Sequence, residues 1–178
     1  MVLIIIALIA VILVIWVIAS YNSLVKLRNK GDEAESAIDA HLKERADLIP
    51  NLVETVKGYA KHEADTLESA ISARNRAEGN AKTEAENALS GALGHLFAVA
   101  ENYPDLKANQ NFLDLQQQLT RIEEEIRNAR KYFNAIVREY NDKIMMFPSS
   151  LIASAFHFAK RDYYEVDDED KKRVDVRF

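Results

Sequence analysis

Hydrophobic residues follow two different patterns along this chain of 178 residues. Residues 2–19 are continuously apolar, and residues 1–20 carry no charge. At about 1.5 Å per residue this run is about 27 Å long, close to the roughly 30 Å thickness of bilayer hydrocarbon. Beyond Ser20, apolar residues recur every three or four positions, which is typical of helices with one buried face. The pattern predicts a transmembrane anchor over residues 1–20, followed by a helical domain.

The apolar run has two alternative interpretations. Val17-x-Ala19 resembles a signal-peptide cleavage site, but the run is too long for a signal peptide and no Lys or Arg precedes it. A core helix that is apolar on all sides would need a larger protein around it. We therefore expect a retained, single-pass anchor. Because Lys26, Arg28 and Lys30 follow the run, the positive-inside rule predicts an external N-terminus and a cytoplasmic C-terminal domain at the plasma or inner membrane.

The apolar stripe of the domain continues directly from the anchor and predicts one long helix that ends near Gly79. The stripe passes through Pro50 in register, so a kink in a continuous helix is expected there. It reaches Leu67 one step out of phase. His41 and Arg45 interrupt the stripe. We interpret them as polar residues between helices that fix the register of packing, or as residues at the edge of the bundle with their charged ends in water. We favour both of these interpretations over a ligand site.

The remaining stripes predict three more helices. These run over residues 83–103, 106–147 and 151–160. The first opens with the capping-box pattern Thr83-x-x-Glu86, and Pro148 ends the second. Because no sheet is predicted, the helices must bury their stripes on one another. We predict an all-α fold: an elongated antiparallel bundle of about four helices over residues 21–160, with a charged, extended tail over 161–178.

Several long segments resemble the LemA family, and they cover nearly the whole chain in the same order. They are YNSLVKLRNK (21–30), LIPNLVETVKGYAKHE (48–63), NYPDLKAN (102–109), YNDKIMMFPS (140–149) and the ending YYEV…VDVRF. The resemblance implies a prokaryotic membrane protein with a helical-bundle domain and no established biochemical activity. Family members near membrane proteases and in organelle-forming systems imply a role in handling membrane proteins. Some relatives carry a lipobox cysteine, which this chain lacks.

Composition argues against several chemistries. The chain has 23 Lys and Arg against 28 Asp and Glu, so an excess of cations for binding a nucleic-acid backbone is missing. The lack of cysteine removes disulfides, thiolate metal sites and cysteine nucleophiles. No histidine has an acidic residue three positions before it, as di-iron bundles require, and no phosphate loop or nucleophile elbow occurs. We therefore predict a protein that is not an enzyme, with no catalytic residues, metal or cofactor.

Residues 48–63 provide the best candidate binding surface, because Asn51, Lys57, Gly58 and His62 lie off the apolar stripe. A glycine on an outer helix face costs roughly 1 kcal/mol relative to alanine. Close approach of a partner would explain that cost. The alternatives, which are equally favoured, are that Gly58 packs against another helix of the bundle or that the glycine is simply tolerated. We predict a scaffold or adaptor that binds other membrane proteins, such as a membrane protease or a second copy of the chain, in quality control or membrane organisation. The alternatives are a self-assembling structural protein and an enzyme with an unrecognised site.

Overall fold

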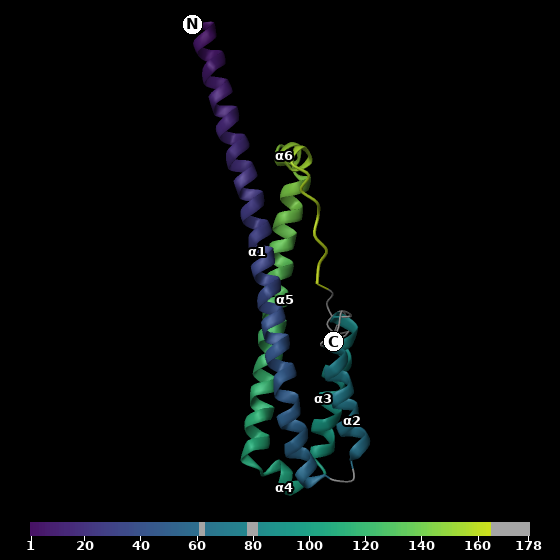
Figure 1. Cartoon of the computed structure of the whole chain (residues 1–178). Coiled ribbons are helices and arrows are strands. Elements are labelled where there is room, and N and C mark those ends of the chain that lie inside the picture. Colours follow the sequence, from purple (N-terminus) through teal and green to yellow (C-terminus); the bar gives the residue numbers. More distant parts are fainter. Residues whose placement is uncertain (61–62, 78–81, 165–178) are drawn as a thin grey trace, which may run out of the picture. The chain divides into compact units, whose positions relative to one another are not determined.

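A computed structural model of the chain describes residues 1–60, 63–77 and 82–164. These residues form six helices, and no strand occurs among them. The helices are α1 (Val2–Tyr59), α2 (Ala64–Ala77), α3 (Lys82–Ala100), α4 (Pro104–Lys107), α5 (Gln110–Met145) and α6 (Ser149–Ala155) (Figure 1). The predicted all-α class and the long apolar N-terminal helix are confirmed.

The first helix differs from the prediction at its end. α1 continues through Pro50 as expected, but it stops at Tyr59 and a new helix begins at Ala64. The phase slip at Leu67 explains the break, because a continuous helix would have turned the later apolar residues away from the core. Tyr59 continues the spacing of the apolar stripe and would be buried on that pattern, but it is 44% exposed. The predicted end near Gly79 instead corresponds to the end of α2 at Ala77.

The predicted helix over residues 106–147 is also divided. A short α4 ends at Lys107, and α5 starts at Gln110. The side-chain Oδ1 of Asn109 accepts a hydrogen bond of 3.0 Å from the backbone N–H of Phe112, the contact by which an N-cap asparagine satisfies the first turn of a helix. α3 begins at Lys82. The predicted capping box depends on the side chain of Thr83, which is not among the side chains that the structure describes.

The chain forms two compact units. The bundle unit comprises residues 38–128. Its core is apolar and receives side chains from α1, α2, α3, α4 and α5, so that the stripes of four long helical segments cover one another. Fully or almost fully buried members are Ile49, Leu52, Val56, Leu67, Ala70, Leu89, Leu93, Leu96, Leu106, Phe112 and Leu119. Two side-chain hydrogen bonds join the helices, from Asn109 to Tyr59 and from Arg45 to Glu123. The later residue of α1 pairs with the earlier residue of the partner segment, so α1 and α5 run antiparallel here.

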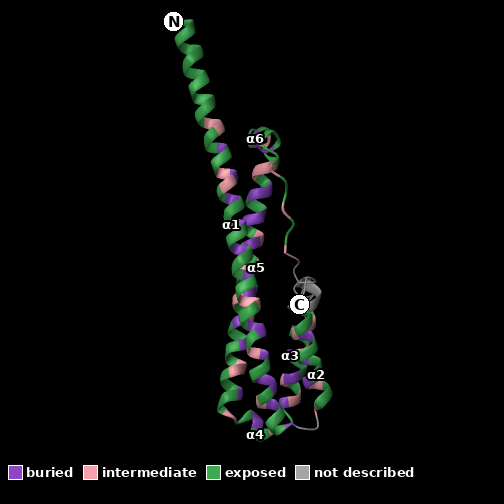
Figure 2. Ribbon diagram, in the orientation of Figure 1, coloured by how far each residue is buried: buried purple, intermediate pink, exposed green. Residues whose placement is uncertain are grey.

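The anchor unit comprises residues 1–37 and 129–178, of which 165–178 lie outside the described residues. Its core lies between α1, α5 and α6 and contains Leu24, Leu27, Tyr140, Ile152 and Ala153. Residues 1–15 of α1 are exposed throughout, as Figure 2 shows. α1 is long and apolar enough to cross a membrane, and no residue of its apolar window is buried by the rest of the protein.

The segment after α6, residues 158–164, is held on α5 by two asparagines. The Asn141 amide donates to the carbonyl oxygen of Arg161 (2.8 Å) and accepts from its N–H (3.0 Å). Asn134 makes the same pair of bonds with Tyr164 (3.0 and 2.8 Å). α6 ends at Ala155, earlier than the predicted Lys160, because His157 takes a positive φ of 57° that no helix accommodates.

Candidate interaction surface and the polar cluster of the bundle

The predicted binding residues lie on the outer side of α1 in the bundle unit. Asn51, Lys57 and Gly58 are all exposed, while His62 lies outside the described residues. Asn51, Glu54 and Gly58 are spaced i, i+3 and i+7, so they share one side of the helix. The Lys57 ammonium lies 3.8 Å from the Glu54 carboxylate, an exposed pair that adds little stability. The described surface is therefore a polar helix face with one position that has no side chain.

Gly58 is open to approach from outside. A Cβ atom built at this position would meet no atom within 4 Å among the described neighbours. Packing of Gly58 against another described helix of the bundle, the alternative left open by the sequence, therefore finds no support. Gly91 and Gly94 on α3 are open in the same way, so an exposed glycine alone does not identify a binding face. Gly91 and Gly94 therefore provide matched controls for substitutions at Gly58.

A buried arginine links three helices of the bundle unit. Arg45 on α1 is only 1% exposed. Its Nη1 donates to Glu123 Oε1 on α5 (2.7 Å) and to Ser90 Oγ on α3 (3.1 Å), while its Nε finds no hydrogen-bond acceptor. A buried guanidinium needs such a carboxylate, because an unpaired charge in a core is strongly destabilising. The position of Arg45 on the core stripe fits the expected role of a polar residue that fixes register.

His41, one turn from Arg45, belongs to a more exposed charge network. Its Nδ1 lies 3.4 Å from Glu125 Oε2 and 3.8 Å from Glu44 Oε2. The ligand atoms of these three residues lie within 4.8 Å of one another, close enough to hold a metal ion. However, the Arg121 guanidinium lies 3.7 Å from Glu44 and 3.8 Å from Glu125, so both carboxylates already have a cationic neighbour. The cluster is therefore explained as an ion-pair network between α1 and α5.

The sequence indicated the polar residues of this region but not their partners. His41 and Arg45 interrupt the apolar stripe, which is a readable signal. Glu123 and Glu125 belong to a run of three consecutive glutamates, Glu123 to Glu125. Because the packing of α5 on α1 decides which of the three reaches Arg45, the sequence alone could not assign that pair.

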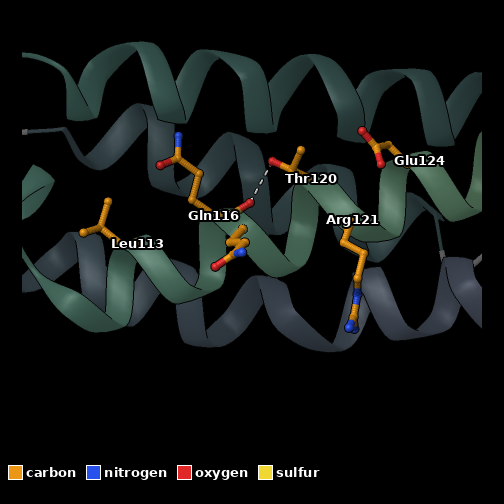
Figure 3. A pocket seen from close by; sticks show the side chains of 6 residues that line it. Leu113, Gln116, Thr120, Arg121 and Glu124 are labelled. Atoms are coloured by element: carbon orange, nitrogen blue, oxygen red, sulfur yellow. Dashed lines mark hydrogen bonds between the residues drawn. The ribbon is translucent and has the colours of Figure 1, made fainter.

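The side of α5 that carries Leu113, Gln116 and Thr120 has a shallow hollow (Figure 3). The lining residues Leu113, Gln116, Gln117, Thr120, Arg121 and Glu124 all belong to α5. The Thr120 hydroxyl donates to the backbone carbonyl of Gln116 (2.9 Å), a bond within the helix. A hollow lined by one helix encloses no ligand and brings no separate catalytic groups together.

Two tyrosines have perturbed acidity. The Tyr103 hydroxyl donates to Glu63 Oε1 (3.1 Å), and this hydrogen bond to a carboxylate raises the pKa of Tyr103 above its ordinary value of 10.0. Burial raises the pKa of Tyr140 in the core of the anchor unit, against a smaller lowering by Arg28 and Arg161. Tyr103 thus links the segment after α3 to the residue that precedes α2, and Tyr140 belongs to the core of the anchor unit.

The predicted membrane flank lies on α1 of the anchor unit. Lys26 and Arg28 are exposed, and Lys30 is half-buried. The Arg28 guanidinium lies 5.7 Å from the ring centre of Phe158, a cation–π distance, and its backbone carbonyl accepts from Arg161 Nη1 (3.2 Å). The flank thus combines cations with aromatic side chains, as at a membrane surface.

Comparison with known proteins decides the family. The profile of the LemA family matches residues 34–178, which is most of the chain. The chain belongs to the LemA family. It is 27% identical to protein LemA of Metamycoplasma hominis over 150 residues, which are 82% of this chain and 66% of that protein. The family and the N-terminal helix together make this chain a membrane-anchored helical protein.

Two magnetosome proteins are also similar to this LemA-family chain. It is 29% identical to magnetosome protein MamQ 2 of Paramagnetospirillum magneticum over 87 residues, 49% of this chain and 32% of that protein. It is 22% identical to magnetosome protein MamQ of Magnetospirillum gryphiswaldense over 174 residues, 81% of this chain and 64% of that protein. The chain spans less than two thirds of the length of either MamQ protein and about two thirds of protein LemA.

Proposed function

We propose that this LemA-family chain is a membrane-anchored scaffold or adaptor, and that the outer face of α1 at Asn51, Lys57 and Gly58 binds another membrane protein. The open Gly58 is the observation that carries the proposal. No described side chain covers it, and close approach of a partner backbone would explain why the helix keeps a glycine here at a cost of roughly 1 kcal/mol relative to alanine. Gly58 lies within residues 48–63, among the off-stripe residues Asn51 and Lys57, whereas Gly91 and Gly94 lie on α3 and serve as controls.

The chemistry of the face indicates the type of partner. It offers an amide at Asn51, a cation at Lys57 and a carboxylate at Glu54, which can form exposed hydrogen bonds and ion pairs at the rim of an interface. A membrane protein is the expected partner because the anchor confines this chain to the same membrane. In the proposed topology the N-terminus is outside and the binding face is in the cytoplasm, as the cations after the apolar run favour.

The experiment compares two charge-matched double variants of the full chain in its own membrane. Lys57→Glu/Gly58→Glu alters the proposed face, and Arg127→Glu/Gly94→Glu alters exposed positions elsewhere in the bundle unit. We expect the first variant to lose chemical crosslinks to its membrane partners while its melting temperature stays close to that of the control, and the control variant to keep the crosslinks. Equal crosslinking by both variants would show that this face does not bind. Crosslinks of about twice the mass of the chain would identify a second copy as the partner.

A further inference from the structure

A group of large apolar side chains is exposed at one end of the anchor unit, where α5 passes into α6. We call residues 145–156 the α5–α6 tip. Exposed fractions of its large apolar side chains are 52% for Met145, 64% for Met146, 81% for Phe147, 59% for Leu151 and 52% for Phe156. Five such residues within twelve positions form a concentrated patch, and patches of this kind mark contact with a protein or a membrane.

The tip lies beside the end of the membrane anchor. The Tyr21 ring on α1 is 4.9 Å from the ring of Phe156 and 5.6 Å from that of Phe158. Trp16 and Val17, within the apolar run, pack against the core to which α6 contributes. Figure 1 shows the same arrangement, with α6 next to α1 and the N-terminal part of α1 projecting beyond it.

These contacts set the depth of the tip relative to the bilayer. Trp16 lies three residues inside the end of the apolar run at Ala19, about 4–5 Å along the helix axis. An element packed against Trp16 and Tyr21 therefore lies at the boundary between headgroups and acyl chains. Amphipathic elements at that boundary bury their apolar side chains about 5–10 Å deep. The exposed side chains of the tip have the position and the polarity of such an element.

Neighbouring polar residues fit the same placement. Lys26 and Arg28 on α1 are exposed close to the aromatic cluster, and Lys143 on α5 binds the Ser23 hydroxyl. Cations beside an apolar tip suit phospholipid headgroups above acyl chains.

We propose that the α5–α6 tip is a second membrane-contacting element, which inserts Met146, Phe147 and Leu151 into the bilayer interface next to the anchor. We take lipid as the occupant, because Phe156 of the tip packs on Tyr21 next to an apolar helix that is long enough to cross a bilayer. The anchor unit would then be attached to the membrane at two points, which restricts its tilt and rotation. This inference does not depend on the binding face of α1.

The lack of cysteine allows a direct test with the full chain reconstituted in vesicles of phosphatidylcholine and phosphatidylglycerol. Met146→Cys and Leu151→Cys each receive an environment-sensitive fluorescent label. Tyr132→Cys is the control, because this residue is 53% exposed and also lies in the anchor unit, about 21 Å along α5 from Met146. Quenching is measured with aqueous iodide and with phospholipid that carries a nitroxide near the top of the acyl chain.

We expect labels at both tip positions to be quenched several-fold less by iodide, and several-fold more by the nitroxide lipid, than the label at residue 132. If the tip labels respond to iodide as the control does, the tip is in water and the proposal is wrong. If they are shielded from iodide but not quenched by the nitroxide lipid, a protein surface such as a second copy covers the tip, and the lipid proposal is equally wrong.

Discussion

Removal of the carboxylate charge opposite Arg45 tests the structure of the bundle unit most sharply. In Glu123→Gln the side chain keeps its shape and an acceptor oxygen, but the buried guanidinium loses its counter-charge at 2.7 Å. Hydrogen bonds to charged groups contribute about 1.5–3 kcal/mol, and breaking a fully buried pair costs about 3–5 kcal/mol. The Glu123 side chain is 34% exposed, so solvent screening places the expected loss near the lower range, at about 2 kcal/mol.

A loss of this size is measurable by thermal unfolding. For a chain of this length about 2 kcal/mol corresponds to a melting temperature lower by about 4–8 °C. The measurement is the circular-dichroism melt of the full chain in detergent micelles. Glu124→Gln is the matched control, because Glu124 is the next residue of α5 and is exposed, so its effect should stay within about 0.5 kcal/mol.

A double variant separates the ion pair from general damage to the helix. Arg45→Met with Glu123→Gln removes both charges and fills the site with an apolar side chain of similar length, which is often neutral for a buried pair. We expect the double variant to be more stable than Glu123→Gln alone. Equal melting temperatures for Glu123→Gln and Glu124→Gln would refute the reasoning. It would also be refuted if the stability loss of the double variant equalled the sum of the losses of Arg45→Met and Glu123→Gln.

Two further predictions concern topology and pH. Protease added to intact cells should leave a tag at the C-terminus untouched, because the positive-inside rule favours a cytoplasmic location for the side of the span that carries the cations. Digestion of the tag would contradict the proposed orientation. Because burial raises the pKa of Tyr140 in the folded state, the folded chain holds this proton more tightly than the unfolded chain. The resulting stability is fully present below pH 10 and is lost as the pH rises through the raised pKa. Tyr140→Phe should therefore show a smaller loss of stability in alkaline melts than the unaltered chain, and identical losses would contradict the stated cause.

Periodicity predicted the helices well where one stripe ran without interruption. The stripe of α5 and the register through Pro50 both depend on spacing within a single helix, which is visible in sequence. The break after Tyr59 was marked by the phase of Leu67. A slip of one position can also arise within a continuous helix, so spacing alone could not distinguish a break from a slip. The start of α5 was missed because the capping role of Asn109 depends on a single side-chain bond.

The exposed residues of the candidate sites could be predicted from the sequence, but contacts between distant segments could not. The sequence identified Asn51, Lys57 and Gly58 as off the stripe, and the structure leaves them exposed; whether they bind a partner stays a prediction. The pairing of Arg45 with Glu123 was not predictable, because it joins residues 78 positions apart. The α5–α6 tip could not be located from the sequence, because the level of its apolar residues beside the anchor depends on the packing of α6 on α1.

Site-specific photocrosslinking in the native membrane tests the central claim most directly. A photoreactive amino acid replaces Gly58 in one chain and Gly94 in another, two open helical positions of the same bundle unit. We expect discrete crosslinked products with a membrane protein from position 58 and none of these products from position 94. The same products from both positions, or no product from position 58 in membranes where the chain is abundant, would contradict the claim that this face of α1 is a binding surface.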